Sequence, residues 1–222
     1  MRSLLLPLFL AAPLAAQQPA AHAHDADPDH MQQGGTLPAG WAGRTDRGQP
    51  LSGARFAAMG TGFHVTTGPA VILYRAADRA NGEFHTLATF TQMKAPMHPE
   101  AYGLFVGGRA LDGEGQQYLY FLVRGNGQFL IKKREGANVT TIVDWTANPA
   151  VVAADSAGKA ANKLEILSKG GQLTFSVNGT QVHQMAMPTA DATGIVGLRV
   201  NHNLDVHVEG FALHQIGGGA GH

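Results

Sequence analysis

The residues best suited to acid–base chemistry lie in two short polar stretches. One is the loop 201–205, Asn-His-Asn-Leu-Asp, and the other is 94–100, Lys-Ala-Pro-Met-His-Pro-Glu. Imidazole and carboxylate groups exchange protons, and together with amide oxygens they can also bind a divalent ion. This makes four residues candidates for catalysis: His98, Glu100, His202 and Asp205. The alternative for the loop is a tight turn in which Asn and Asp bond their own backbone and Asn203 takes a left-handed conformation.

A second candidate site lies on the stretch 116–134, which reads as two strands joined by Gly125-Asn126-Gly127. Side chains alternate across a strand, so Leu119, Phe121 and Val123 would face a core while their neighbours face outward. The strand 195–201 alternates in the same way. One shared surface is predicted to bind a ligand through six residues: Tyr118, Tyr120, Arg124, Arg199, Asn201 and His207. Sugar rings stack on aromatic faces, and Arg and Asn bond their hydroxyls. The alternative is an ordinary half-exposed sheet face on which Tyr and Arg cover apolar area.

Histidines and aspartates also cluster near the N-terminus. His22, His24 and His30 lie close to Asp25, Asp27 and Asp29. Such a set can bind a transition metal ion, which makes the three histidines candidate metal ligands. The alternative is a solvated tail with incidental metal affinity, because nothing in the local pattern holds these ligands rigidly.

The elements that must position these residues are short strands. Runs rich in β-branched and aromatic residues, separated by turn residues, predict strands at 55–59, 62–67, 70–75, 83–92, 102–107, 116–124, 128–134, 139–145, 163–168, 173–177, 181–185, 195–201 and 206–214. Asn178-Gly179 is the favoured pair for a tight hairpin turn. In the last strand, Phe211 and Leu213 are out of phase with Val206 and Val208, so we expect a bulge at Glu209-Gly210. No amphipathic helix is evident. The pattern predicts an all-β fold: a two-sheet antiparallel sandwich or barrel.

Composition narrows the class of protein further. The chain has 222 residues, 16 basic and 16 acidic side chains, and no cysteine. A net charge of zero gives no reason to expect a nucleic-acid partner. Arg2, an apolar run over 4–14 and an alanine-rich exit are typical of a secretory signal peptide, cleaved near Ala16 or Ala23. We therefore expect an exported protein with no membrane span. Its organisation would be a signal peptide at 1–23, a flexible lead-in at 24–50, one sandwich domain at 51–216 and a glycine-rich tail at 217–222.

Several segments resemble the concanavalin A-like lectin/glucanase superfamily. They are Tyr102-Gly-Leu-Phe-Val-Gly-Gly, Tyr118-Leu-Tyr-Phe-Leu-Val-Arg, Thr140-Thr-Ile-Val-Asp-Trp, Asn162-Lys-Leu-Glu-Ile, Leu173-Thr-Phe-Ser-Val-Asn-Gly and Gly194-Ile-Val-Gly-Leu-Arg-Val. The resemblance covers roughly 55–216 and looks closest to secreted bacterial domains of the laminin-G-like and 3-keto-disaccharide hydrolase type. It implies a jelly-roll sandwich. Laminin-G-like domains often hold calcium at a rim, which makes calcium a possible cofactor and Asp205 its candidate ligand.

The function that follows is carbohydrate binding on the concave sheet face. Glucanases of this superfamily carry an E-x-D-x-x-E strand motif, and this sequence has none. Two alternatives remain open. One is a hydrolase or lyase acting on a modified disaccharide, which requires at least two of His98, Glu100, His202 and Asp205 to meet in one pocket. The other is a structural envelope protein without a small ligand. The sequence does not determine the sugar or the oligomeric state.

Overall fold

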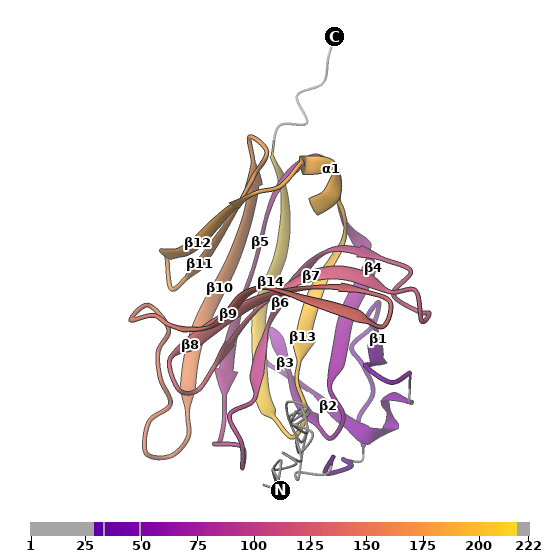
Figure 1. Ribbon diagram of the computed structural model, residues 1–222. Coiled ribbons are helices and arrows are strands. Elements are labelled where there is room, and N and C mark those ends of the chain that lie inside the picture. Colours follow the sequence, from indigo (N-terminus) through magenta and orange to yellow (C-terminus); the bar gives the residue numbers. More distant parts are fainter. Residues whose placement is uncertain (1–28, 33, 49, 217–222) are drawn as a thin grey trace, which may run out of the picture.

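Two antiparallel seven-stranded sheets pack face to face (Figure 1). The computed structural model describes residues 29–32, 34–48 and 50–216. The first sheet has the strand order β1 (Ala42–Thr45), β4 (Val71–Ala80), β13 (Gly194–Val200), β6 (Ala101–Arg109), β7 (Gln117–Arg124), β8 (Gln128–Glu135) and β9 (Asn138–Ala147). The second has the order β12 (Thr180–Ala186), β11 (Gln172–Val177), β10 (Ala160–Lys169), β5 (Glu83–Gln92), β14 (Asp205–Ile216), β3 (Gly62–Thr67) and β2 (Ala54–Met59). The described helices are one 3-10 turn, η1 (Leu51–Gly53), and α1 (Thr189–Ala192).

The main core lies between the sheets and follows from strand alternation. Leu119, Phe121 and Val123 of β7 point into it, as do Phe129 and Ile131 of β8. All five are buried, with 4% or less of each exposed. The core face expected for the 116–134 hairpin is therefore confirmed.

The outer face of the first sheet is also largely apolar. A second cluster of buried side chains lies there, including Tyr118, Tyr120, Leu122 and Leu130. The alternate residues of β7 and β8 thus pack against one another on the outer side of the sheet. Because these outer side chains are buried, other parts of the protein cover part of the outer face of the first sheet.

Local turn and bulge expectations are confirmed. Asn178 and Gly179 have φ values of 52° and 79°, as the hairpin between β11 and β12 requires. The pairing of β14 with β5 shifts register between Glu209 and Ala212, which is the predicted bulge. The thirteen predicted strands all occur, with their bounds moved by a few residues.

The N-terminal lead-in differs from expectation in its described part. Residues 42–45 form the edge strand β1, which pairs with β4. Trp41 packs against Phe63 and Phe211, with ring centroids 5.0 and 5.3 Å apart. Further upstream, the Gln32 N–H donates to the Gly53 carbonyl over 3.0 Å. The sandwich thus takes its edge strand from the segment that was expected to be a lead-in.

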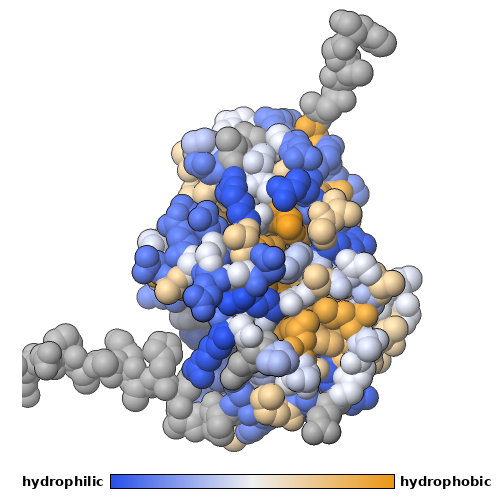
Figure 2. Space-filling model, turned by 90° about the vertical axis from the view of Figure 1, so that its right-hand side faces the viewer, coloured by the Kyte–Doolittle hydropathy of each residue, from blue (hydrophilic) through white to orange (hydrophobic). Residues whose placement is uncertain are grey.

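In the face shown in Figure 2, hydrophilic residues predominate and surround one larger hydrophobic area. Within the described residues, no helix is long and apolar enough to cross a membrane. The predicted signal peptide and the glycine-rich tail at 217–222 lie outside those residues.

Candidate ligand-binding pocket

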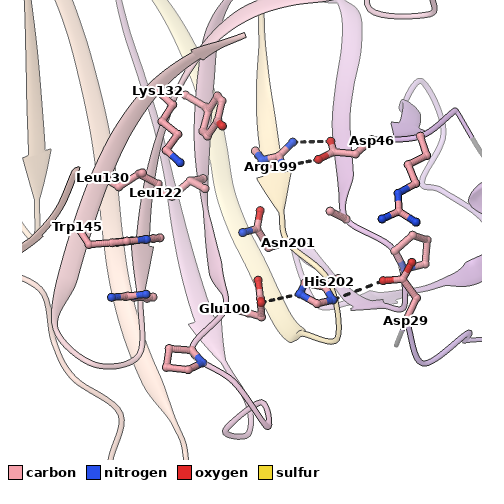
Figure 3. A pocket seen from close by; sticks show the side chains of 16 residues that line it. Asp29, Asp46, Glu100, Leu122, Leu130, Lys132, Trp145, Arg199, Asn201 and His202 are labelled. Atoms are coloured by element: carbon pink, nitrogen blue, oxygen red, sulfur yellow. Dashed lines mark hydrogen bonds and ion pairs between the residues drawn. The ribbon is translucent and has the colours of Figure 1, made fainter. Parts of the chain in front are cut away.

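A pocket of about 410 Å³ opens on the outer face of the first sheet. Its floor comes from β7 and β8, which contribute Tyr120, Leu122 and Leu130. Figure 3 shows Lys132, Leu130 and Trp145 along one side, and Arg199, Asp46 and Asp29 along the other. The pocket is therefore made by the sheet together with the lead-in segment and the ends of β6 and β13.

One wall is an aromatic plane with a guanidinium over it. The Arg124 guanidinium carbon lies 4.0 Å from the centre of the Trp145 ring, at the distance of a cation–π contact. Gln128 Oε1 accepts a hydrogen bond from Arg124 Nε over 2.9 Å and a second, shorter one from its Nη2. Burial lowers the pKa of Arg124, although Glu100 and Asp144 act to raise it. The group stays a cation, in contact with the ring and with a neutral amide.

A β-bulge aims Trp145 into the pocket. Thr146 pairs with Phe129 and Val143 pairs with Ile131, so two residues of β9 stand opposite Leu130 alone. Strict alternation would place Trp145 on the same side as Val143, toward the main core. The extra residue turns it to the outer face, where it packs against the second apolar cluster.

The opposite wall is a buried ion pair. Arg199 is 7% exposed, and its Nη1 and Nη2 donate to the two Asp46 carboxylate oxygens over 2.7 and 2.6 Å. Nη1 also donates to the Tyr118 hydroxyl over 3.0 Å, and Arg134 lies 3.3 Å from Asp46. Burial acts to raise the pKa of Asp46, but Arg199 and Arg134 outweigh it and hold that pKa below its usual 3.8. Burial likewise acts to lower the pKa of Arg199, and Asp46 more than reverses this.

A second charged group lies at the base of the pocket. His202 Nε2 is 2.6 Å from Glu100 Oε1, and His202 Nδ1 is 3.5 Å from Asp29 Oδ1 (Figure 3). Glu100 and His202 are only 12% and 15% exposed. A carboxylate in contact with an imidazole can relay a proton, so this group has the composition of an acid–base pair.

The structure brings together most of the residues singled out in the sequence. The pocket lining includes Tyr120, Arg124, Arg199 and Asn201 from the predicted ligand patch, and Glu100 and His202 from the catalytic candidates. Their outward placement follows from the same alternation that buries Val196, Leu198 and Val200 in the main core.

Tyr118 is a correction to the predicted patch. It is 2% exposed and does not line the pocket. The Phe105 and Tyr120 rings pack against it, with centroids 5.2 and 5.6 Å from that of Tyr118. The Tyr118 hydroxyl accepts a hydrogen bond from Arg199. Tyr118 therefore supports the floor of the pocket instead of stacking on a ligand.

His207 is a second correction. It lies on β14, which belongs to the other sheet, and it pairs across the strands with His64. Their ring centroids are 5.6 Å apart. Asp205 lies there too, with Oδ1 2.7 Å from His64 Nε2 and Oδ2 3.9 Å from Lys94 Nζ. Alternation predicts which face a residue takes within a sheet, but not which sheet its strand joins.

The remaining candidates do not gather into one site. His98 is exposed and lies outside the pocket lining. The His30 N–H donates to Asn203 Oδ1 over 2.7 Å, while His22 and His24 lie outside the described residues. Across the described part of the chain, no group of three or more His, Cys, Asp or Glu side chains is placed to hold a metal ion. A calcium or transition-metal site at Asp205 or His30 is therefore not supported by the described residues.

Solved structures share this architecture at low sequence identity. A carbohydrate-binding module, CBM66 from Bacillus subtilis, matches with a TM-score of 0.58 and 13% identity over 79% of this chain and 96% of the module. A Bacillus subtilis protein of unknown function with a galectin-like fold matches with a TM-score of 0.58 and 13% identity, over 79% of this chain and 89% of that one. The VIP36 exoplasmic/lumenal domain, in its Ca²⁺/Man3GlcNAc-bound form, gives a TM-score of 0.54 at 7% identity, covering 80% of this chain and 84% of that domain.

The chain shares the β-sandwich fold of these structures, one of which is described as galectin-like. The predicted two-sheet antiparallel sandwich is thus confirmed as the fold. No protein-family model matches the chain, and no curated protein sequence matches it.

The pocket residues that the sequence did not indicate as site residues include Asp46, Lys132 and Trp145. Asp46 lies in the segment taken for a loose lead-in, and it meets Arg199 from 153 residues away. Lys132 is the cross-strand partner of Tyr120, so the hairpin register could have placed it on the patch. Trp145 could have been found only by anticipating the bulge in β9.

Proposed function

We propose that this protein binds carbohydrate in the pocket on the outer face of the first sheet. The observation that carries the proposal is the Trp145 plane, which stands at the wall of a 410 Å³ pocket beside polar groups. A sugar presents C–H groups on its ring faces and hydroxyls at its edges, so it requires an aromatic plane with donors and acceptors around it. In this pocket Lys132 supplies hydrogen-bond donors, Glu100 supplies acceptors, and Asn201 supplies both.

Two of the similar solved structures are of proteins that bind carbohydrate, which supports this proposal. CBM66 is described as a carbohydrate-binding module, and the VIP36 domain was solved with a bound mannose-containing glycan. These are properties of those proteins. For the present chain, the pocket itself has to carry the assignment, because one sandwich serves many functions.

A glycan array, followed by titration calorimetry on the best oligosaccharide, tests the proposal. Trp145→Ala should weaken binding by at least about tenfold, since truncating a central aromatic contact commonly removes more than 1.4 kcal/mol of binding energy. Ile142→Ala is the matched control, because Ile142 is an exposed residue of the same strand outside the pocket lining. Binding to no glycan, or equal binding by both variants, would reject the assignment and favour a structural role.

A second candidate function is an enzyme acting on a bound disaccharide. Glu100 and His202 were two of the four catalytic candidates, and they meet in the pocket at 2.6 Å with Asp29 on the other imidazole nitrogen. The pair could exchange a proton with a sugar hydroxyl or a leaving oxygen. Incubation with the bound oligosaccharides and chromatography of the products tests this reaction. Turnover by the wild-type protein that is lost in Glu100→Gln would support an enzymatic function. Intact oligosaccharide in every incubation would leave carbohydrate binding as the proposed function.

We also propose that the chain is exported. Residues 1–23 have the composition of a signal peptide, and the described residues include no membrane-spanning helix. N-terminal sequencing of the protein recovered outside the cytoplasm should begin at Gln17 or His24. A protein that retains Met1 and stays with the cytoplasmic fraction would contradict export.

A further inference from the structure

The carboxylates that line the pocket are already in contact with basic side chains of the protein. Asp46 is in contact with Arg199 at 2.6 Å and with Arg134 at 3.3 Å. Glu100 and Asp29 share His202 at 2.6 and 3.5 Å. The negative charge of the pocket is therefore concentrated on the side of the lead-in and the β13–β14 turn, and much of it is compensated there.

Among the described residues, the cations on the facing side have no carboxylate in direct contact, although Glu100 and Asp144 are close enough to act on the pKa of Arg124. Lys132 lines the pocket, and within the described part of the chain it has no carboxylate partner. The hydrogen-bond acceptor of Arg124 is the neutral amide oxygen of Gln128, and its guanidinium carbon lies 4.0 Å from the centre of the Trp145 ring. The wall formed by β7, β8 and β9 thus presents two positive charges beside an aromatic plane.

These two cations sit around an apolar strip. Leu122 and Leu130 are cross-strand partners on the same face of the hairpin, as are Tyr120 with Lys132 and Arg124 with Gln128. Lys132 and Arg124 therefore flank the Leu122–Leu130 pair on the pocket floor. Figure 3 shows Lys132 reaching toward the pocket from this side, across from Arg199 and Asn201. A ring lying over the leucines against Trp145 would have a cation at either end.

We propose that the preferred ligand is an acidic glycan, whose anionic group is bound by Lys132 and Arg124 while its ring stacks on Trp145. This inference rests on the proposed carbohydrate binding and adds the chemical class of the sugar. A neutral sugar would leave the two cations without a carboxylate in contact once it displaced water from the pocket. An anionic substituent supplies that charge, and its charge-assisted hydrogen bonds are stronger than neutral ones. Hydroxyls at the far end of the ligand would donate to Glu100 and Asp29.

The anionic group of such a glycan can be either a uronic-acid carboxylate or a sulfate ester. Three oligosaccharide sets of matched length separate them: galacturonic acid oligomers, sulfated galactose oligomers without carboxylates, and neutral galactose oligomers. We expect at least one acidic set to bind wild-type protein about tenfold or more tightly than the neutral set, as one charge-assisted hydrogen bond would give. Raising the salt concentration should narrow this ratio.

Substitutions at two neighbouring lysines test whether Lys132 causes the preference for acidic ligands. Lys132→Met keeps the length of the side chain and removes the charge, and it should reduce the acidic-to-neutral affinity ratio about tenfold. Lys133→Met is the matched control, because Lys133 lies next along β8, pairs with Glu135 at 2.9 Å and is outside the pocket lining. It should leave the ratio as in wild type. Circular dichroism of both variants checks that they are folded.

The outcomes separate the two proposals. Neutral oligomers that bind as tightly as both acidic sets, with Trp145→Ala weakening all of them, would overturn the acidic preference and leave carbohydrate binding in place. A preference for acidic oligomers that Lys132→Met and Lys133→Met change equally would overturn the role of Lys132. No binding by any oligosaccharide set would remove the proposed function and this inference together.

Discussion

The buried pair of Asp46 and Arg199 allows a quantitative prediction about stability. Asp46→Ala removes the carboxylate that accepts two hydrogen bonds from Arg199, at 2.7 and 2.6 Å. The guanidinium keeps one hydrogen bond, to Tyr118 at 3.0 Å, and its contact with the Tyr120 ring at 5.0 Å. Neither neutral group supplies a counter-charge. The variant therefore leaves a cation that is 7% exposed without an anion.

The expected cost follows from this geometry. Removing one partner of a buried ion pair destabilises a protein by about 3–5 kcal/mol. The Asp46 side chain is 28% exposed and lines the pocket, so water can reach the vacated position and partly solvate Arg199. We therefore expect about 3 kcal/mol, the lower end of that range. For a domain of this size the loss should lower Tm by about 6–12 °C.

Urea denaturation and calorimetry measure the effect. Asp78→Ala is the control, because its ion pair with Arg75 at 2.5 Å is partly exposed and should contribute less than about 1 kcal/mol. The double variant Asp46→Ala/Arg199→Met should recover much of the loss, since it removes the stranded charge together with its partner. A cost below about 1 kcal/mol for Asp46→Ala, or no recovery in the double variant, would refute the role given to this pair.

Two further outcomes follow from the same structure. The folded pKa of Asp46 lies below its usual 3.8, so its contribution to stability is complete above that value and is lost as pH falls through the folded pKa. The stability difference between wild type and Asp46→Ala should accordingly be constant near neutral pH and shrink below about pH 4, as denaturation across a pH series would show. Asn162→Ala should cost about 2–4 kcal/mol in urea denaturation, because the fully buried Asn162 accepts from the Val152 N–H over 2.8 Å and donates to its carbonyl over 3.1 Å. Asn126→Ala, in the exposed turn after β7, should change stability by less than about 1 kcal/mol.

Properties that repeat along the chain could be predicted from the sequence. Alternation placed Arg199 and Tyr120 on one outer face and Leu198 and Phe121 in the core, and the structure confirms both placements. The phase change between Val208 and Phe211 predicted the bulge in β14. Each of these conclusions needs only neighbours within one strand, because backbone pleating fixes which way successive side chains point.

Properties that depend on distant pairing could not be predicted in this way. His207 alternates correctly, yet its strand joins the second sheet, so the residue lies away from the patch. Asp46 meets Arg199 only when β1, β4 and β13 have come together in the first sheet. Trp145 breaks the alternation itself, since the bulge in β9 turns it outward. In all three cases the missing information is a contact between strands, which no local pattern carries.

The 153-residue separation between Asp46 and Arg199 also orders events in time. A ribosome makes Asp46 long before Arg199, so one rim of the pocket cannot close until β13 has been synthesised and inserted between β4 and β6. Contacts this distant in sequence form late, because chain entropy must be lost before they can contribute. A partly folded chain would hold the β7–β8 hairpin with its aromatic and cationic wall but lack the facing wall. Ligand binding would therefore report that folding has reached completion.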